Sequence, residues 1–233
     1  MILCLETATD ICSVALCNED SIRGLKESTL ERSHASSLTV LTEDILREAG
    51  IKVADLEAIA VSKGPGSYTG LRIGVSTAKG LAYASSVPLI GIDTTLSMYY
   101  GFITCFKEKH KIRKDDLFCP AIDARRMEIY YSVIDTAGNT VLDTRAEVIG
   151  PDSFTDLPPS SRIFLFGNGA DKCRNVIRRE NIIIEDDFRI SASYMQKPAY
   201  IALKNKQLED IAYFEPFYLK DFLTTLPVKN ILK

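Results

Sequence analysis

Short apolar runs separated by polar turns fill most of the first part of the chain. Runs of this length, rich in Ile, Leu, Val and Cys, favour strands. Leu38, Leu41 and Ile45 instead recur at the three- and four-residue intervals of an amphipathic helix, for which Ser33 is the expected N-cap and Gly50 the stop signal. The expected strands are 2–6, 12–17, 21–28, 55–61 and 88–92, and further helices are expected after the glycine-rich stretch at 64–70 and over 94–102.

A run of charged residues at 107–116 interrupts this pattern. Such a run is typical of a solvated linker, so we divide the chain into an N-terminal lobe at 1–106, a linker at 107–116 and a C-terminal lobe at 117–233. The second lobe repeats the first in outline, with Glu6 and Asp123 each ending the first strand of its half. Its expected elements are strands 118–122, 128–134, 141–149 and 162–166, a glycine turn at 167–169 and a helix over 171–179.

The glycine-rich stretch between the fourth strand and the second helix has two interpretations. A strand, a glycine turn and a helix can cradle a phosphate, because free N–H groups at a helix N-terminus attract anions. The glycine spacing, however, matches neither G-x-G-x-x-G nor the P-loop pattern. Gly70, Gly74 and Ala78 recur every four residues and so share one helix face, which they leave almost flat. We therefore favour a face shaped for the close approach of a second helix.

Composition limits the cellular locations, the partners and the metal sites that we expect for this chain. A net charge of −3 gives no global attraction to nucleic acid, so any contact with RNA needs a local patch or a partner. The N-terminus lacks a basic segment before its apolar run, and no apolar run approaches bilayer length, so we expect neither a signal peptide nor a membrane span. Six scattered cysteines without a C-x-x-C pair, and only two histidines, predict buried reduced thiols, a cytoplasmic protein and no zinc site.

Three segments resemble the TsaB (YeaZ) family of bacterial proteins. They are Leu5-Glu6-Thr7-Ala8 near the start, GPGSYTGLRIG from Gly64 to Gly74, and EPFYL from Glu215 to Leu219. The resemblance implies a two-lobed α/β fold of the actin, Hsp70 and hexokinase ATPase type. Each lobe of that fold is a ribonuclease H-like βββαβα unit, and we expect the second lobe to be reduced.

The resemblance also implies a function without catalytic residues. The family assists synthesis of N6-threonylcarbamoyladenosine at position 37 of tRNAs that read codons beginning with A. We therefore expect a non-catalytic scaffold and activator of TsaD, an essential subunit of the transferase complex, which TsaE and tRNA join. TsaD holds a metal through an H-x-x-x-H pair. Here the corresponding positions are His34 and Leu38, so no metal is expected, since one imidazole and a leucine cannot share an ion.

The partner interface is expected on the two helices of the first lobe, which would pair with the matching helices of TsaD or with a second copy of this chain in a homodimer. The alternative is that both apolar stripes pack only on their own sheet, with His34 a partly exposed surface residue. Arg72 could fix the neighbouring loop or cross the interface. The expected interface residues are His34, Leu38, Leu41, Ile45, Gly70, Leu71, Arg72, Gly74, Val75 and Ala78.

A vestigial nucleotide site is a further hypothesis, with weak ATP or ADP binding and otherwise no cofactor. Its candidate residues are Glu6, Thr7, Asp123, Gly167, Asn168 and Gly169. Such acids and glycines also occur in turns that bind nothing. An autonomous ATP-dependent kinase or ATPase of the same fold is the alternative function. A hydrolase built on His34 with Ser36 or Ser67 is disfavoured, because the chain has no G-x-S-x-G elbow.

Overall fold

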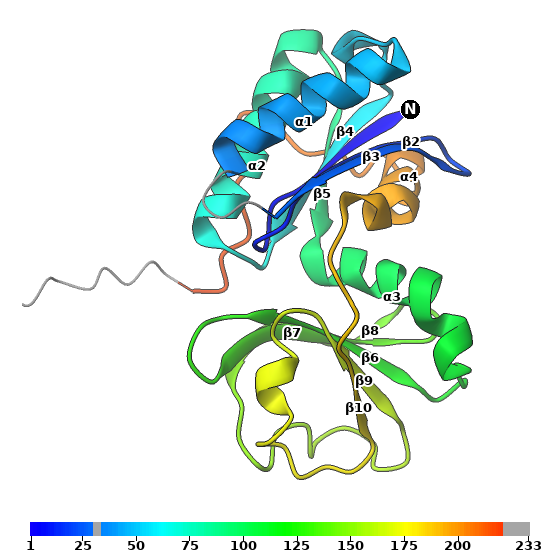
Figure 1. Ribbon diagram of the computed structural model, residues 1–233, viewed down its shortest axis with the longest axis vertical. Coiled ribbons are helices and arrows are strands. Elements are labelled where there is room, and N and C mark those ends of the chain that lie inside the picture. The colour runs from blue at the N-terminus through cyan, green and yellow to red at the C-terminus, as the bar shows by residue number, and fades with distance from the viewer. Residues whose placement is uncertain (30–33, 221–233) are drawn as a thin grey trace, which may run out of the picture.

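Two five-stranded sheets form the framework of the molecule (Figure 1). The computed structural model describes residues 1–29 and 34–220. The first sheet has the order β3-β2-β1-β4-β5, in which β1 pairs antiparallel with β2 and parallel with β4. Its strands are β1 (Ile2–Glu6), β2 (Cys12–Cys17), β3 (Ile22–Ser28), β4 (Ala58–Gly64) and β5 (Leu89–Asp93).

The second sheet repeats this order as β8-β7-β6-β9-β10. Its central strand β6 again pairs antiparallel with the next strand along the chain and parallel with β9. The duplicated strand order confirms the predicted actin- and hexokinase-like fold. The strands are β6 (Leu117–Asp123), β7 (Glu128–Asp135), β8 (Thr140–Val148), β9 (Ile163–Phe166) and β10 (Ile182–Glu185).

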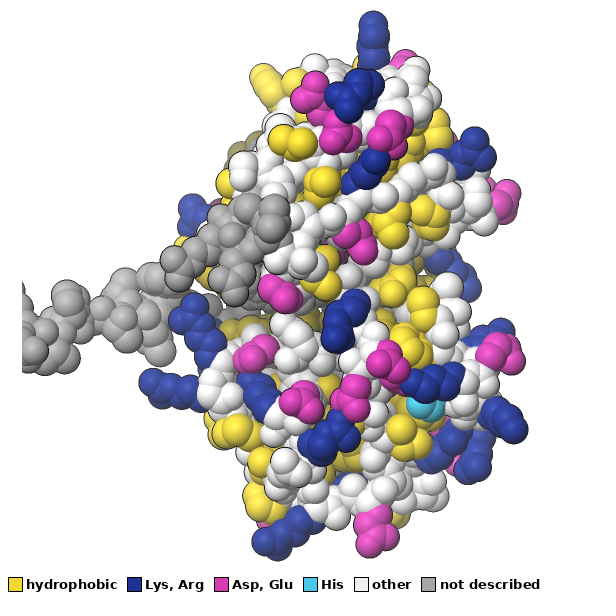
Figure 2. Space-filling model, in the orientation of Figure 1, with side chains coloured by type: hydrophobic (Ala, Val, Ile, Leu, Met, Phe, Trp, Pro, Cys, Tyr) yellow, Lys and Arg dark blue, Asp and Glu magenta, His cyan; other side chains and the backbone are white. Residues whose placement is uncertain are grey.

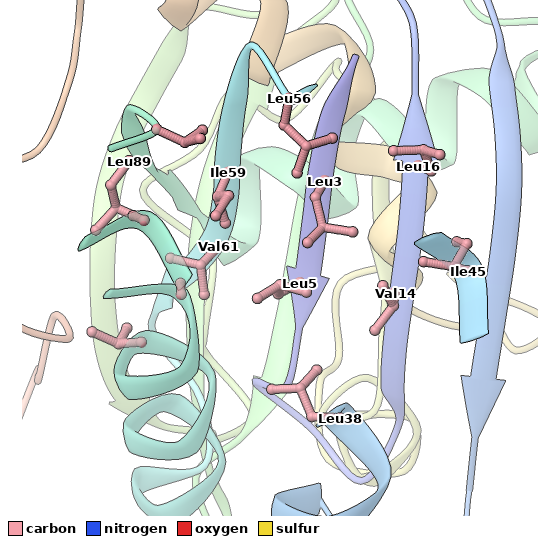
Figure 3. Close-up of a cluster of buried hydrophobic side chains, with 14 of the residues drawn as sticks. Leu3, Leu5, Val14, Leu16, Leu38, Ile45, Leu56, Ile59, Val61 and Leu89 are labelled. Carbon is pink, nitrogen blue, oxygen red and sulfur yellow. The ribbon is translucent and has the colours of Figure 1, made fainter. Parts of the chain in front are cut away.

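Helices cover both faces of the first sheet. One face carries α1 (His34–Ala49) and α2 (Tyr68–Ser85), and its core combines strand residues such as Leu3 and Val61 with Leu38 and Ile45 of α1 (Figure 3). The opposite face is covered by α4 (Gln196–Lys204) and the short 3-10 helix before it. Strands buried on both faces read as continuous apolar runs, which explains why the sequence pattern identified β1, β2 and β4 so clearly.

The helix α3 (Thr94–His110) lies between the two sheets (Figure 1). It packs Met98, Tyr99 and Phe102 against the second sheet, where Phe118 and Phe164 belong to the same cluster. Met98 and Phe102 lie four residues apart and therefore on one face of the helix. The aromatic cluster joins α3 firmly to the second lobe, although the chain enters the helix directly from β5 of the first.

The second lobe departs from the prediction at its helix. The expected helix over 171–179 is wrong, since only a 3-10 turn at Asp171–Cys173 forms there. This lobe also has no helix between β8 and β9 among the residues that the structure describes. Sequence patterns likewise missed β10 and α4. The expected N-cap Ser33 lies outside the described residues.

The predicted lobe boundaries also need correction. Residues 107–110 belong to the last turn of α3, because the aromatic stripe of the helix continues through Phe106 to His110, whose ring lies against Phe102. The connection is therefore limited to residues 111–116. After β10 the chain returns to the first lobe, where Ala199 and Tyr200 of α4 pack behind the first sheet. Residues 192–214 thus complete the first lobe's cores rather than extending the second.

The surface mixes charges of both signs over both lobes, without a field of one sign on the face shown in Figure 2. Within residues 1–29 and 34–220, no helix combines the length and apolarity needed to cross a bilayer. Five of the six cysteines are buried thiols, as predicted, whereas Cys105 on α3 is exposed.

Candidate docking face and inter-lobe cleft

The glycine face of α2 points into the protein. A Cβ atom on Gly70 would collide with the carbonyl oxygen of Thr7, and one on Gly74 would collide with the hydroxyl of the same residue. The Thr7 hydroxyl also donates a hydrogen bond of 2.8 Å to the Gly70 carbonyl. Ala78 is fully buried in the same direction. The prediction that this face is left open for a second helix is therefore wrong: the small residues let α2 lie close to the end of β1.

The apolar stripes of both helices are buried by the chain itself. Leu38 and Ile45 of α1 and Leu71 and Val75 of α2 are at most 3% exposed, and three of them belong to the core beside the first sheet. A helix on a sheet must bury one apolar stripe, and the strongest stripe of each helix serves this purpose. Of the predicted interface residues only Arg72 is exposed, with His34 and Leu41 partly so.

A different surface of the two helices remains open. On α2 the exposed side carries Ser76, Gly80 and Ala84, which again recur every four residues, and a Cβ on Gly80 would meet nothing within 4 Å. Tyr83 beside them is 79% exposed, and Val40 of α1 is 55% exposed. We call this surface, formed by the outward sides of α1 and α2, the outer helix face. Sequence spacing alone could not separate it from the buried face, since both sides of α2 carry small residues.

Partly buried apolar residues of both helices lie at the edge of the core. Leu41 of α1 and Ile73 and Leu81 of α2 pack against the core and stay partly exposed. The two helices also contact each other directly. We call these three residues the apolar seam; with Val40 and Tyr83 they supply apolar side chains to the outer helix face.

Arg72 contacts Tyr68 at the start of α2, and Tyr68 in turn contacts the last described residues. Its guanidinium donates a 2.7 Å hydrogen bond to the Tyr68 hydroxyl and lies 5.4 Å from the centre of that ring. The bond to Tyr68 raises the pKa of Arg72. The ring of Tyr68 packs against that of Tyr218, with the ring centres 5.0 Å apart and the planes tilted by 34°. Of the two roles predicted for Arg72, fixing the neighbouring loop is the one with contacts in this chain.

His34 is anchored to the backbone. Its Nε2 lies 2.8 Å from the carbonyl oxygen of Thr9, and the ring is partly buried. Leu38, one turn further, is buried in the core and cannot share a ligand with it. Among the described residues, no group of three or more His, Cys, Asp or Glu side chains could hold a metal ion.

Glu6 ends β1 in a fully buried position beneath the glycine-rich turn. Its Oε1 accepts hydrogen bonds from Ala8 N at 2.6 Å and from Ser62 Oγ at 2.9 Å. Its Oε2 has no hydrogen-bond partner within residues 1–29 and 34–220. Burial dominates over these bonds and raises the pKa of Glu6 from 4.5 to about 7. A carboxyl enclosed in this way is poorly suited to organising a magnesium ion through water.

The corresponding acid of the second lobe is already paired. Asp123 accepts a 2.7 Å bond from Lys172 Nζ and a 2.6 Å bond from the amide of Arg125. Asn168 caps the Asp123 amide, and the Gly169 amide donates to the carbonyl of Ala121. Gly167 and Gly169 also lie so close to β6 that a Cβ on either would collide with its backbone. The Asn168 side chain and the Gly169 amide are thus hydrogen-bonded to other groups of the second lobe, and the arrangement does not fit a phosphate cradle.

A cavity of about 930 Å³ nevertheless lies between the lobes. Its walls come from the loop after β1, the start of α2, the β6–β7 turn and the end of the described chain. Residues on these walls include Thr9, Ser67, Arg125, Tyr130, Phe217 and Lys220. Sequence reasoning assigned no site role to Phe217, Tyr218 and Lys220, although the aromatic pair in the EPFYL segment was a visible signal.

Comparison with known proteins agrees with this architecture. The family model "TsaD: tRNA N6-adenosine threonylcarbamoyltransferase" matches residues 18–218. The tRNA threonylcarbamoyladenosine biosynthesis protein TsaB of Escherichia coli is 37% identical over 131 residues, a match that spans 56% of this chain and about half, 53%, of the E. coli protein. TsaB of Haemophilus influenzae is 26% identical over 96% of this chain and 94% of its own length.

A solved structure extends the match to three dimensions. YeaZ from Pseudomonas aeruginosa superposes with a TM-score of 0.78 at 25% identity, covering 94% of this chain and 99% of that one. Both the sequence and the fold are therefore shared over nearly the whole length. The family model that this chain matches is the TsaD model, and the chain belongs to the TsaB (YeaZ) family.

Proposed function

We propose that this protein is a non-catalytic scaffold and activator of TsaD in the synthesis of N6-threonylcarbamoyladenosine on tRNA. A role in this biosynthesis is supported by the names of its relatives and by the matching family model. The observation that carries the scaffold role is the outer helix face, an exposed surface with an apolar seam that packing on the core buries only in part. Apolar surface at the centre of a contact, with aromatic residues beside it, is typical of protein interfaces.

The proposed docking mode uses the small residues of α2. Ser76, Gly80 and Ala84 would let a partner helix approach α2 closely, while Val40 and Tyr83 would pack at its sides. A partner with matching helices would bury the seam formed by Leu41, Ile73 and Leu81. The same face would support a homodimer when the protein is alone, since a two-fold contact uses one patch twice.

We propose a non-catalytic role because of the contacts that the two candidate acids, Glu6 and Asp123, make. Glu6 is enclosed beneath the glycine-rich turn, Asp123 is paired with Lys172, and the 167–169 turn bonds within its own lobe. Reaction chemistry would therefore be supplied by TsaD, and this chain would need no cofactor. TsaE and tRNA would join through the complex, in the cytoplasm.

Matched substitutions test the docking mode. Val40→Glu places a charge on the outer helix face, and Val148→Glu makes the same change on β8 of the second lobe, where Val148 is 70% exposed. Burying an unpaired carboxylate costs several kcal/mol, so we expect Val40→Glu to weaken co-purification with TsaD from the same organism by about 100-fold or more, and Val148→Glu to leave it unchanged. Gly80→Trp should weaken it as well, and all three variants should keep the wild-type circular dichroism.

The biosynthetic role is tested by a reconstituted tRNA modification assay. Omitting this chain should abolish or strongly reduce threonylcarbamoyladenosine formation, and Val40→Glu should behave like the omission. Normal modification without the chain would refute the activator role. Turnover of ATP by the purified chain alone would instead support the kinase or ATPase alternative.

A further inference from the structure

The last described residues form a strap that runs from the first lobe to the second. After α4 the chain passes the edge strand β5, where the amide of Glu209 donates to the carbonyl of Leu89. It then follows α2 towards the junction of the lobes, as the orange-to-red segment in Figure 1 shows. We call residues 212–220 the strap. Its Phe217 lines one cavity together with Gly66 of the glycine-rich turn and another together with Leu96 of α3.

The strap is fixed to the first lobe by two kinds of contact. Lys79 Nζ of α2 donates a 2.8 Å hydrogen bond to the carbonyl of Phe214, whose ring is 7% exposed in the core. The amide of Phe217 donates a 2.6 Å bond to the carbonyl of Lys63. The carbonyl of Phe217 lies so close to Gly64, at φ +123°, that any side chain there would collide with it. The turn and the strap are thus built to fit each other.

The same strap reaches the second lobe and divides the cleft. Lys220 pairs with Glu128 of β7. Phe217 lies on the wall of the large cavity and also on the wall of a second cavity of about 340 Å³, which Ser132 and Ile134 of β7 line from the other lobe. Phe217 therefore separates two cavities that lie along the lobe junction.

The outer end of the strap is held from the surface of α2. The ring of Tyr218 packs against that of Tyr68 at a tilt of 34°, and Arg72, which is exposed, donates a hydrogen bond to the Tyr68 hydroxyl. Tyr218 itself is 38% exposed and Tyr68 37%. One of the contacts that hold the strap over the cavity is therefore accessible from outside the cleft.

We propose that the strap is a latch on the inter-lobe cleft, and that the stack of Arg72, Tyr68 and Tyr218 on the surface of α2 holds it closed. Releasing the stack leaves residues 217–220 held by the Phe217–Lys63 hydrogen bond and the Lys220–Glu128 ion pair, so the strap opens more often. Opening joins the two cavities and uncovers the glycine-rich turn. The latch does not depend on the proposed function. It connects contacts made at the surface of α2 with opening of the cleft, because Arg72 is exposed on the same helix as Gly80 and Tyr83.

Hydrogen–deuterium exchange on the full chain tests the latch. Arg72→Ala removes an exposed side chain and should leave the fold intact. We expect exchange to rise about tenfold in peptides covering 64–70 and 215–220, because a hydrogen bond and a cation–π contact to the stack are lost. Tyr213→Ala is the matched control, since Tyr213 lies in the same strap but is 83% exposed. Unchanged exchange in Arg72→Ala, or an equal rise in both variants, would overturn the proposal.

A fluorescent reporter gives an independent readout. The chain contains no tryptophan, so Phe217→Trp introduces a single emitter between the two cavities. Adding Arg72→Ala to this variant should shift the emission to the red and raise quenching by acrylamide several-fold, whereas adding Tyr213→Ala should change neither. Emission insensitive to Arg72→Ala would mean that the stack does not hold the strap.

Discussion

Glu6 makes the stability of this protein depend on pH in a direction opposite to that of most carboxylates. Burial raises its pKa from 4.5 to about 7. The folded state therefore keeps a proton that the unfolded state releases between these two values. Stability falls as pH rises through this window and stays at the lower level above it, because both states are then ionised.

The magnitude follows from the two pKa values. A difference from 4.5 to about 7 corresponds to about 3 kcal/mol, most of which is lost between about pH 5 and pH 8. Because the side chain is fully buried, solvent screening reduces this figure little. The two bonds to Oε1, from Ala8 and Ser62, oppose the shift but do not cancel it.

Glu6→Gln removes the titration while keeping the shape. The new amide nitrogen near the position of Oε2 finds no acceptor, which costs about 1–3 kcal/mol at every pH. The informative quantity is therefore the difference in unfolding free energy between wild type and variant. We expect it to change by about 2–3 kcal/mol in favour of the variant between about pH 5 and pH 8.

Urea unfolding followed by far-ultraviolet circular dichroism measures this difference, since the chain lacks tryptophan. Glu43→Gln, which removes an exposed carboxylate of α1, is the control and should track the wild type at both pH values. A wild-type-minus-variant difference that stays constant with pH would refute the account of Glu6 as a buried acid that is protonated below neutral pH.

Further predictions concern packing in the first lobe. Gly74→Ala should destabilise the protein by about 1–3 kcal/mol, because its Cβ would collide with Thr7, whereas Gly80→Ala in the same helix should stabilise it by up to about 1 kcal/mol. Thermal unfolding of the pair compares the two sides of α2, and equal shifts would contradict the inward direction of Gly74. Phe214→Ala should cost about 3–5 kcal/mol in urea unfolding, since its ring fills the core beneath the strap. A cost within error of that for Tyr213→Ala would show that the ring is not buried in solution.

The sequence predicted the framework well because buried strands carry their own signature. The runs at 2–6 and 12–17 became β1 and β2 without a shift, since strands covered on both faces are continuously apolar. The second lobe was less predictable. The expected helix over 171–179 had suitable composition, but the residues after β9 pack as turns around Cys173 instead.

Sequence spacing could not predict which side of a helix faces the core and which faces the solvent. The spacing of Gly70, Gly74 and Ala78 correctly indicated a flat face made for close approach, yet the approaching group is Thr7 of the same chain. Ser76, Gly80 and Ala84 have the same spacing on the exposed side. A period of four defines a face, whereas only the contacts of the folded chain decide what lies against it.

The return of residues 192–202 to the first lobe has a consequence for synthesis on the ribosome. These residues cover the back of the first sheet, with Ile2, Cys4 and Ile92, and are translated after the strands of the second lobe. Until they emerge, an apolar sheet surface that includes β1 has no cover. The first lobe is therefore completed only after the second sheet has been translated, so a nascent chain halted after α3 should need a chaperone, and a fragment ending at residue 116 should aggregate rather than fold.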